Sequence, residues 1–261
     1  MNTSSSSLTC LALIPARAGS KRVVSKNTRL LAGHPMLAYT IASALDSGVF
    51  QRVIVSTDSP EIAEIARQYG AEVPFLRPET LATDQSPDIE WLSHLLLKLR
   101  ESGETADCFS ILRPTSPFRQ PETIQRAWQA FVADGSADSL RAIEKCAQHP
   151  AKMWQIHGNR MTPIMQNPDP TGTPWHSTPY QSLPPVYVQN ASLEIAWCRI
   201  PLEQDSIAGE NILPFITEGY EGFDINTPED LIVAEHLIQQ GLATLPKAPV
   251  FAQSGVKLGL K

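Results

Sequence analysis

Hydrophobic and polar positions in the first half of the chain alternate between runs typical of buried strands and stretches typical of amphipathic helices. The strand-like runs are continuous and apolar or β-branched, and they span 8–15, 52–56, 72–75 and 109–112. Between and after them, apolar residues at helical spacing predict helices over 35–45, 60–69, 87–100 and 121–133. This alternation predicts an α/β fold, a Rossmann-like doubly wound and mostly parallel sheet with helices on both faces.

The second half begins differently. Residues 147–190 are rich in proline and have no clear periodicity, which indicates a loop too long for a compact domain without a specific reason. Its apolar residues predict an extension that packs on another subunit. Beyond it, we expect strands over 186–188 and 193–198 and a capped helix over 227–240.

The expected organisation is one domain with two tails. The domain includes the extension and covers 8–245, with an unpacked tail at 1–7 and a flexible tail at 246–261.

Charge is unevenly placed along the chain. The 261 residues carry 21 Lys and Arg against 27 Asp and Glu, a formal net charge of −6. The first 45 residues nevertheless contain five basic residues and no acid, which makes them +5. An acidic chain with one basic segment is unlike a nucleic-acid-binding protein and indicates a compact anionic ligand.

Other features of the composition point to a cytoplasmic enzyme. No apolar run approaches the 18 residues or so of a membrane span, and the start lacks the basic region of a signal peptide. The 4 cysteines are far apart and form no CxxC pair, so we expect reduced thiols without a metal or disulfide role.

The basic residues cluster directly after the first predicted strand, within 14–27. This position lies at the carboxyl edge of a parallel sheet, where ligands bind in open α/β folds. Small residues there would let backbone N–H groups approach a phosphate. The spacing matches neither a Walker A loop nor the dinucleotide GxGxxG motif. A solvated basic turn is the alternative interpretation.

The segment resembles the signature of the CMP-sialic acid synthetases (acylneuraminate cytidylyltransferases), in which A-R-x-x-S-K-x-x-x-x-K-N follows the first strand. Arg17, Ser20, Lys21, Lys26 and Asn27 match that signature. Further matches follow in order and extend the resemblance over residues 9–240, at 54–58, 76–78, 81–84, 114–117, 149–152, 183–184, 190 and 224–227.

The resemblance implies a glycosyltransferase-A-like nucleotide-binding fold and a cytidylyltransferase reaction. The anomeric hydroxyl of an acidic 2-keto sugar attacks the α-phosphate of CTP, and CMP-sugar and pyrophosphate result with the help of Mg²⁺. The expected substrates are CTP and a nonulosonic acid of the sialic, legionaminic or pseudaminic type. A homodimer is expected, with the extension reaching toward the partner's site; neither nucleic acid nor membrane is an expected partner.

By the same resemblance, Arg17 and Lys21 hold the triphosphate, and Lys21 stabilises charge on the leaving pyrophosphate. Asn27 and Arg77 would recognise the cytidine. Asp88 would lie near the base, although a favourable charge at a helix start explains it equally well. The expected nucleotide-binding set is Ala16, Arg17, Gly19, Ser20, Lys21, Lys26, Asn27, Arg77 and Asp88.

The family's D-I-D-T motif supplies two carboxylates, which suit Mg²⁺. Here the segment reads Asp224-Ile225-Asn226-Thr227, so the expected metal ligands are Asp224 and Asn226. One negative charge fewer predicts weaker metal binding. The expected catalytic residues are Arg17, Lys21 and Asp224.

Three departures from the family's motifs fall on the sugar side. Q-P-T-S-P begins with Arg113 here, P-R-Q-x-L-P has Tyr180 in place of its arginine, and N-G-x-I-Y ends with Glu194. In the family, the lost Arg and Tyr help to bind the acidic sugar. We hypothesise that Arg113 takes over the sugar carboxylate, since Arg pairs with carboxylates in a bidentate manner; a different sugar is the alternative. The expected sugar-binding set is Arg113, Thr115, Ser116, Lys152, Tyr180, Gln181, Asn190 and Glu194.

Two further functions remain open from the sequence. A nucleotidyltransferase of the same fold that uses a Kdo-like sugar is disfavoured by the Lys26-Asn27 ending of the signature. A non-catalytic sugar-nucleotide-binding subunit would explain Asn226, but the intact set of triphosphate cations argues against it.

Overall fold

The computed structural model describes residues 8–19 and 25–248, so the tail predicted at 1–7 and most of the one at 246–261 lie outside it. A six-stranded sheet in the order β10-β6-β9-β5-β1-β4 forms the centre. Its strands are β1 Cys10–Pro15, β4 Arg52–Ser56, β5 Cys108–Ile111, β6 Ser139–Lys145, β9 Tyr187–Trp197 and β10 Ile212–Ile216. Strand β1 pairs in parallel with β4 and β5, whereas β5 pairs antiparallel with β9.

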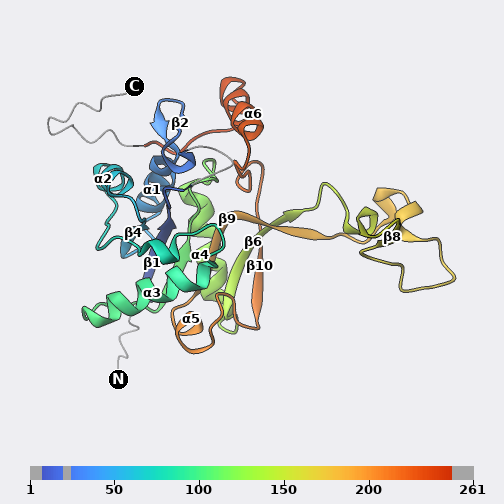
Figure 1. The fold of residues 1–261 in the computed structure, drawn as a ribbon, viewed down its shortest axis with the longest axis horizontal. Helices are drawn as coiled ribbons and strands as arrows, with labels where there is room; N and C mark the ends of the chain where they lie inside the picture. Colours follow the sequence, from blue (N-terminus) through green and yellow to red (C-terminus); the bar gives the residue numbers. More distant parts are fainter. Residues whose placement is uncertain (1–7, 20–24, 249–261) are drawn as a thin grey trace. The chain divides into compact units, whose positions relative to one another are not determined.

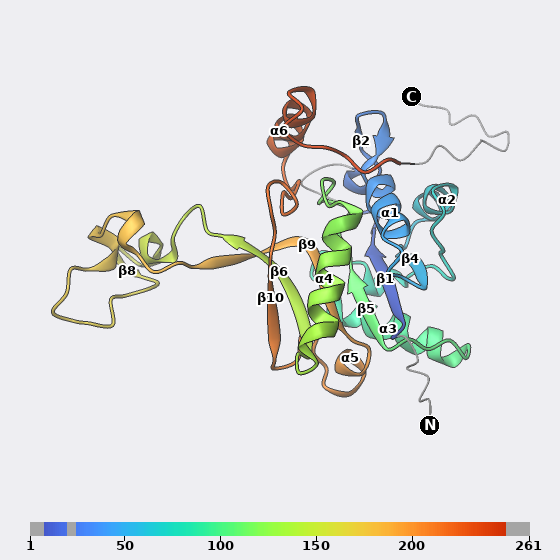
Figure 2. The same ribbon diagram turned by 180° about the vertical axis from the view of Figure 1, so that it is seen from behind.

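Helices cover both faces of this sheet, as predicted (Figures 1 and 2). They are α1 Met36–Asp46, α2 Pro60–Gln68, α3 Asp88–Glu101, α4 Pro121–Asp134, α5 Arg199–Glu203 and α6 Pro228–Gln239. Alternate residues of β1 separate the two layers. Cys10, Ala12 and Ile14 pack with α1, α2 and α4, while Leu11 and Leu13 pack with α3 on the other face. This alternation is the period-2 pattern of a strand buried on both sides.

A third apolar cluster attaches α6 to the start of α1. Leu231, Ala234 and Leu237 of α6 pack with Met36 and Tyr39. The two short strands that precede α1, β2 Leu30–Leu31 and β3 His34–Pro35, form a separate antiparallel pair. This packing fixes α6, and with it the segment that precedes α6, to the part of the chain that contains the sheet.

A second compact unit covers Ile143–Gln189, close to the segment that the sequence sets apart. It contains an antiparallel hairpin, β7 Trp154–His157 and β8 Arg160–Pro163, and three 3₁₀ helices at Pro150–Lys152, Trp175–Ser177 and Tyr180–Ser182. The hydroxyl of Tyr180 donates to the backbone oxygen of Cys146, and a ring nitrogen of His149 accepts from Ala151 at 3.1 Å. The predicted loop therefore has secondary structure of its own, and its role against a partner subunit stays a prediction.

Two strand predictions were wrong. Residues 72–75 form no strand, and only an isolated bridge joins Glu72 to Ile54. The strands expected over 186–188 and 193–198 are parts of the single strand β9. Strands β6 and β10 were not predicted. Among the described residues, no helix has both the length and the apolar character needed to cross a membrane.

Helix α6 begins with a reciprocal capping box. The hydroxyl of Thr227 accepts from the backbone N–H of Asp230 at 3.3 Å, and the Asp230 carboxylate accepts from the N–H groups of Thr227 and Asn226 at 2.8 Å each. These bonds satisfy donors that a helix start leaves unpaired. They also fix the backbone that carries Asp224.

We expect Thr227→Ala to lower the free energy of unfolding by about 1 kcal/mol, because the cap loses its side-chain acceptor. Urea denaturation followed by circular dichroism measures the change. Thr105→Ala, at an exposed loop position, is the matched control and should unfold like the wild type. Equal midpoints for the two variants would contradict a stabilising cap.

Candidate functional site

A cavity of about 300 Å³ opens where the parallel strands β1 and β5 end. Its walls come from the loop after β1, the segment that leads into α3, the loop after β5 and the segment before α6. Nine of the residues expected from the sequence line it: Arg17, Lys26, Asn27, Arg77, Asp88, Arg113, Thr115, Asp224 and Asn226. The carboxyl ends of parallel strands thus bring together residues that lie up to about 200 positions apart.

Arg17 lies on the wall that the loop after β1 supplies. Its guanidinium contacts the Asp84 carboxylate at 2.6 Å and, more weakly, the backbone oxygen of Ala82 at 3.5 Å. The buried side chain of Asn27 donates to the backbone oxygen of Arg17 at 3.0 Å. Asn27 therefore holds the loop that presents Arg17, and its predicted contact with cytidine stays a prediction.

The backbone of this loop is less open to a phosphate than its small residues suggest. The N–H of Ala16 donates to the backbone oxygen of Ser56 at 2.9 Å, which extends the pairing of β1 with β4. The N–H of Ala18 donates to the Asp58 carboxylate at 2.9 Å. The N–H of Ala16 is therefore already used, and its predicted place in the nucleotide-binding set stays a prediction.

Three other predicted nucleotide contacts in this loop stay predictions. Gly19 is described but does not line the cavity. Ser20 and Lys21 lie outside the described residues.

Arg77 is held rigidly on the wall between β4 and α3. It donates to the hydroxyl and the backbone oxygen of Ser56 at 3.0 and 2.9 Å. Its guanidinium carbon lies 4.8 Å from the ring centroid of Trp91, a cation–π arrangement. Burial lowers the pKa of Arg77 to about 10, so it stays charged at neutral pH. This is a fixed cation beside an aromatic ring, suited to recognition of a nucleobase.

Asp88 is the first residue of α3, in agreement with the helix-start interpretation, and it also joins two side chains of this wall. One carboxylate oxygen accepts from the indole N–H of Trp91 at 2.7 Å, and the other accepts from Arg113 at 2.5 Å. Although burial alone would raise it, contact with Arg113 and Trp91 leaves the pKa of Asp88 below its usual value. Asp88 is thus an ionised anchor between two cavity side chains.

Asp224 and Asn226 lie together on the wall formed by the segment before α6, and both line the cavity. The amide nitrogen of Asn226 donates to Oδ2 of Asp224 at 2.5 Å, and its oxygen accepts from Nζ of Lys26 at 3.0 Å. The N–H of Ile225 donates to the backbone oxygen of Thr115 at 2.9 Å and ties this segment to the loop after β5.

The remaining oxygen of Asp224 fits a divalent cation. Oδ1 is buried and has no hydrogen-bond partner among the described residues. A buried carboxylate oxygen without a partner is unfavourable unless a cation or solvent contacts it. Asn226 is a weaker candidate for a metal ligand than expected, because its side-chain oxygen already accepts a hydrogen bond from Lys26.

No cluster of three or more His, Cys, Asp or Glu side chains that could hold a metal occurs within the described ranges. Mg²⁺ usually completes such a site with phosphate oxygens and water. Asp224 therefore fits a metal that is shared with a bound triphosphate.

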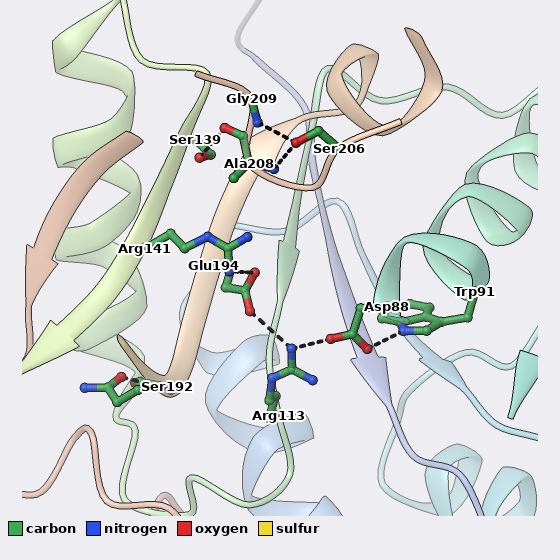
Figure 3. A network of polar contacts seen from close by, with 11 residues as sticks. Asp88, Trp91, Arg113, Ser139, Arg141, Ser192, Glu194, Ser206, Ala208 and Gly209 are labelled. Carbon is green, nitrogen blue, oxygen red and sulfur yellow. Dashed lines mark hydrogen bonds and ion pairs between the residues drawn. The ribbon is translucent and has the colours of Figure 1, made fainter. Parts of the chain in front are cut away.

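Of the expected sugar-binding residues, five belong to the unit that contains the cavity and three to the second compact unit. Arg113 and Thr115 line the cavity. Ser116 and Glu194 are buried and do not line it. Glu194 contacts Arg113, which does line the cavity, at 3.2 Å (Figure 3). Asn190 donates to the hydroxyl of Thr217 at 2.9 Å. Ser116 and Glu194 therefore do not line the cavity, and their predicted role toward the sugar stays a prediction.

The other three belong to the second compact unit. Nζ of Lys152 donates to the backbone oxygens of His176 and Thr178 at 3.1 and 2.8 Å. The hydroxyl of Tyr180 is engaged with Cys146, and Gln181 is exposed. Lys152 and Tyr180 stabilise their own unit, and a role for all three toward the sugar stays a prediction.

Two cavity residues escaped the sequence interpretation. Trp91 is 2% exposed, as a core residue would be, yet it also lines the cavity and contacts Arg77 and Asp88. Asp84 belongs to a segment that matched the family, but only the structure shows its contact with Arg17. The sequence offered one indication of a role for Asp84, since it is the only acid in the matched segment 81–84.

Comparison with known proteins finds similarity to cytidylyltransferases. The profile of the cytidylyltransferase family matches residues 11–152. The chain is 40% identical over 233 residues to a CMP-N,N′-diacetyllegionaminic acid synthase of Legionella pneumophila, covering 88% of this chain and 96% of that one.

Two further similarities are more partial. An N-acylneuraminate cytidylyltransferase of Escherichia coli is 45% identical over 121 residues, which are 46% of this chain and 28% of that one. The solved structure of a CMP:2-keto-3-deoxy-manno-octonic acid synthetase complexed with CTP superposes with a TM-score of 0.65 at 16% identity, covering 89% of this chain and 99% of that one. That likeness shows the fold, a nucleotidyltransferase sheet of the expected kind.

Proposed function

Because this chain belongs to the cytidylyltransferase family, we propose that it transfers CMP from CTP to a nonulosonic acid of the legionaminic type and releases pyrophosphate. One observation carries the proposal: a single cavity combines Arg17, Lys26 and Arg77 with a carboxylate oxygen of Asp224 that no described residue hydrogen-bonds. Cations for a triphosphate and an oxygen ligand for a metal are the two requirements of this chemistry. The similarity to the Legionella enzyme over nearly its whole length supports the choice of sugar.

The reaction joins the anomeric oxygen of the sugar to the α-phosphorus of CTP and breaks the bond between the α-phosphorus and the bridging oxygen of pyrophosphate. Arg17 and Lys26 would neutralise the phosphates and stabilise the negative charge that moves onto the leaving group. Arg77, fixed by Ser56 and Trp91, would hold the cytosine edge. Mg²⁺, held by Asp224, would supply additional positive charge to the triphosphate. Because CTP is the proposed donor, we place the reaction in the cytoplasm.

A nucleotide and sugar panel tests the proposal. Pyrophosphate release is measured with CTP, UTP, GTP or ATP against N,N′-diacetyllegionaminic, pseudaminic, N-acetylneuraminic and Kdo-type acids, with and without Mg²⁺. We expect turnover only with CTP and Mg²⁺, fastest with the legionaminic acid. Preference for Kdo would support the related sugar transferase instead, and CTP binding without turnover under any condition would support a non-catalytic subunit.

We further propose that the second compact unit joins two copies of the chain. Both strands of its hairpin are largely exposed, and Ile156 and Met161, which pair directly across it, are 76% and 57% exposed. Apolar side chains placed together on a surface in this way mark an interface more often than a solvated face.

We expect the double variant Ile156→Asp/Met161→Asp to elute as a monomer when the wild type elutes as a dimer, because two charges cannot be buried in an apolar interface. Size-exclusion chromatography with light scattering measures the mass. Ile232→Asp, on an equally exposed apolar position of α6, is the matched control and should remain dimeric. A monomeric wild type at micromolar concentration, or a dimeric double variant, would contradict the proposal.

A further inference from the structure

Arg113 is the least expected side chain in the cavity, because two acids already bind it. It follows β5, and its Nη2 contacts Oδ2 of Asp88 at 2.5 Å and Oε1 of Glu194 at 3.2 Å. Figure 3 shows both contacts meeting at one guanidinium nitrogen. Strand pairing explains the position of Glu194, since β9 runs antiparallel to β5 and places Glu194 opposite Ile111, two residues before Arg113.

The other donors of this guanidinium face a different environment. Neither Nη1 nor Nε of Arg113 has a polar partner within the part of the chain that the structure describes. The side chain is 30% exposed and lines the cavity. The two acids therefore orient the guanidinium through Nη2 and leave its remaining N–H groups available to a ligand.

The positive charge of Arg113 is met by two carboxylates before any ligand enters. The second oxygen of Glu194 also contacts Arg141 at 2.5 Å, and Arg77 is a further cation near Asp88. A ligand carboxylate at Arg113 would nevertheless be a third negative group at one guanidinium, within reach of one buried and one partly buried acid. Like charges that share a poorly solvated site are unfavourable. This wall therefore suits an uncharged ligand group.

The same pairing explains two of the departures from the family's motifs. Arg113 replaces a glutamine and Glu194 replaces a tyrosine of those motifs, and the structure shows that the two new side chains contact each other. The positive charge of Arg113 is therefore accompanied by the negative charge of Glu194, which is also absent from the family's motif. That arrangement disagrees with the expectation that Arg113 replaces a lost carboxylate reader, which would need an uncompensated positive charge.

We propose that Arg113 determines sugar specificity by donating hydrogen bonds to an acetamido carbonyl oxygen of the sugar, with Asp88 and Glu194 as positioning residues. The proposal rests on the proposed function. Guanidinium N–H groups only donate, so their partner must be an acceptor. An acetylated nonulosonic acid carries three kinds of acceptor oxygen without a proton: its carboxylate, its ring oxygen and its amide carbonyls. The two acids at Arg113 disfavour the carboxylate, and of the other two the amide carbonyl is the stronger acceptor.

The test compares two sugars that share the carboxylate and differ in the acetamido groups. N,N′-diacetyllegionaminic acid carries them, and ketodeoxynonulosonic acid has hydroxyls and none. We measure kcat/KM for each sugar, and dissociation constants by calorimetry in the presence of CDP, for the wild type, Arg113→Met and Arg113→Gln. Arg113→Met should weaken binding of the diacetylated sugar about tenfold and change the other sugar less than about twofold. Arg113→Gln retains an N–H donor and should recover part of the loss.

A matched control separates this effect from damage to the fold. Arg126 also contacts two acids, Glu221 at 3.0 Å and Glu218 at 3.7 Å, but lies away from the cavity. Arg126→Gln should bind both sugars like the wild type, and thermal unfolding checks that every variant is folded. Glu194→Gln should raise KM for the diacetylated sugar and leave KM for CTP unchanged.

Three results would overturn the proposal. An equal loss for both sugars would show that Arg113 reads the shared carboxylate, a loss confined to CTP would place it at the nucleotide, and unchanged binding would leave it without a ligand role. Failure of the proposed function has a different signature, absence of pyrophosphate release by the wild type with any sugar. Calorimetry still compares the two sugars in that case.

Discussion

Replacing Asp224 with alanine should lower kcat for pyrophosphate release about a thousandfold while the protein stays folded. The reason is the buried Oδ1, which no described residue satisfies and which is therefore placed for a cation. Removing this carboxylate removes an unfavourable buried oxygen but also the acceptor of the Asn226 amide, so the free energy of unfolding without metal should change little. Stopped-flow pyrophosphate detection and urea denaturation measure the two effects.

Metal binding gives a readout that is independent of turnover. Electron paramagnetic resonance of Mn²⁺ in the presence of CTP should show bound ion in the wild type and little in Asp224→Ala. Glu229→Ala is the matched control, because Glu229 is an exposed acid at the start of the neighbouring helix α6 and does not line the cavity. Activity of Asp224→Ala within tenfold of the wild type would remove Asp224 from the reaction.

Sequence patterns predicted the site best where a buried strand runs into a loop. β1, β4 and β5 are continuous apolar runs, and their carboxyl ends must meet at one edge of a parallel sheet. Arg17 and Arg113 follow two of these strands directly, so their common location could be predicted from order alone. The distant Asp224 was predicted by its motif, and the backbone bond from Ile225 to Thr115 shows what holds it there.

The strands that escaped prediction have mixed environments. β6 carries Arg141 between the buried residues Leu140 and Ala142, and a charge at that position argues against a buried strand. Only the contact with Glu194 makes it tolerable. β10, at the edge of the sheet, packs Leu213 and Phe215 on the core and exposes its other residues, but all five of its residues are apolar, so its sequence shows no alternation of polar and apolar positions.

Pairings between charged side chains were also beyond the sequence. Glu194 lies 81 positions from Arg113, and their contact depends on the antiparallel register of β9 with β5. The sequence predicted a mostly parallel sheet and gave no reason to pair the two residues. The sequence thus showed that each residue departs from its motif, but it did not show that the charges of Arg113 and Glu194 compensate each other.

Arg17→Ala should lower kcat/KM for CTP about a hundredfold, because charge-assisted hydrogen bonds to phosphate are lost both in binding and in the transition state. Initial-rate kinetics with varied CTP measures the change. Arg29→Ala is the matched control, since Arg29 is a basic residue of the same segment that is exposed and outside the cavity lining. A similar effect of both variants would show that only the general positive charge of the segment matters.

The partner of Arg17 predicts an effect of opposite sign. Asp84 binds the Arg17 guanidinium at 2.6 Å and must release it for a triphosphate to take its place. Exchange of one anionic partner for another costs part of the binding free energy of the nucleotide. Asp84→Ala should therefore lower KM for CTP, and Arg17→Ala/Asp84→Ala should bind CTP no better than Arg17→Ala alone. A raised KM in Asp84→Ala would show instead that Asp84 holds Arg17 in its productive position.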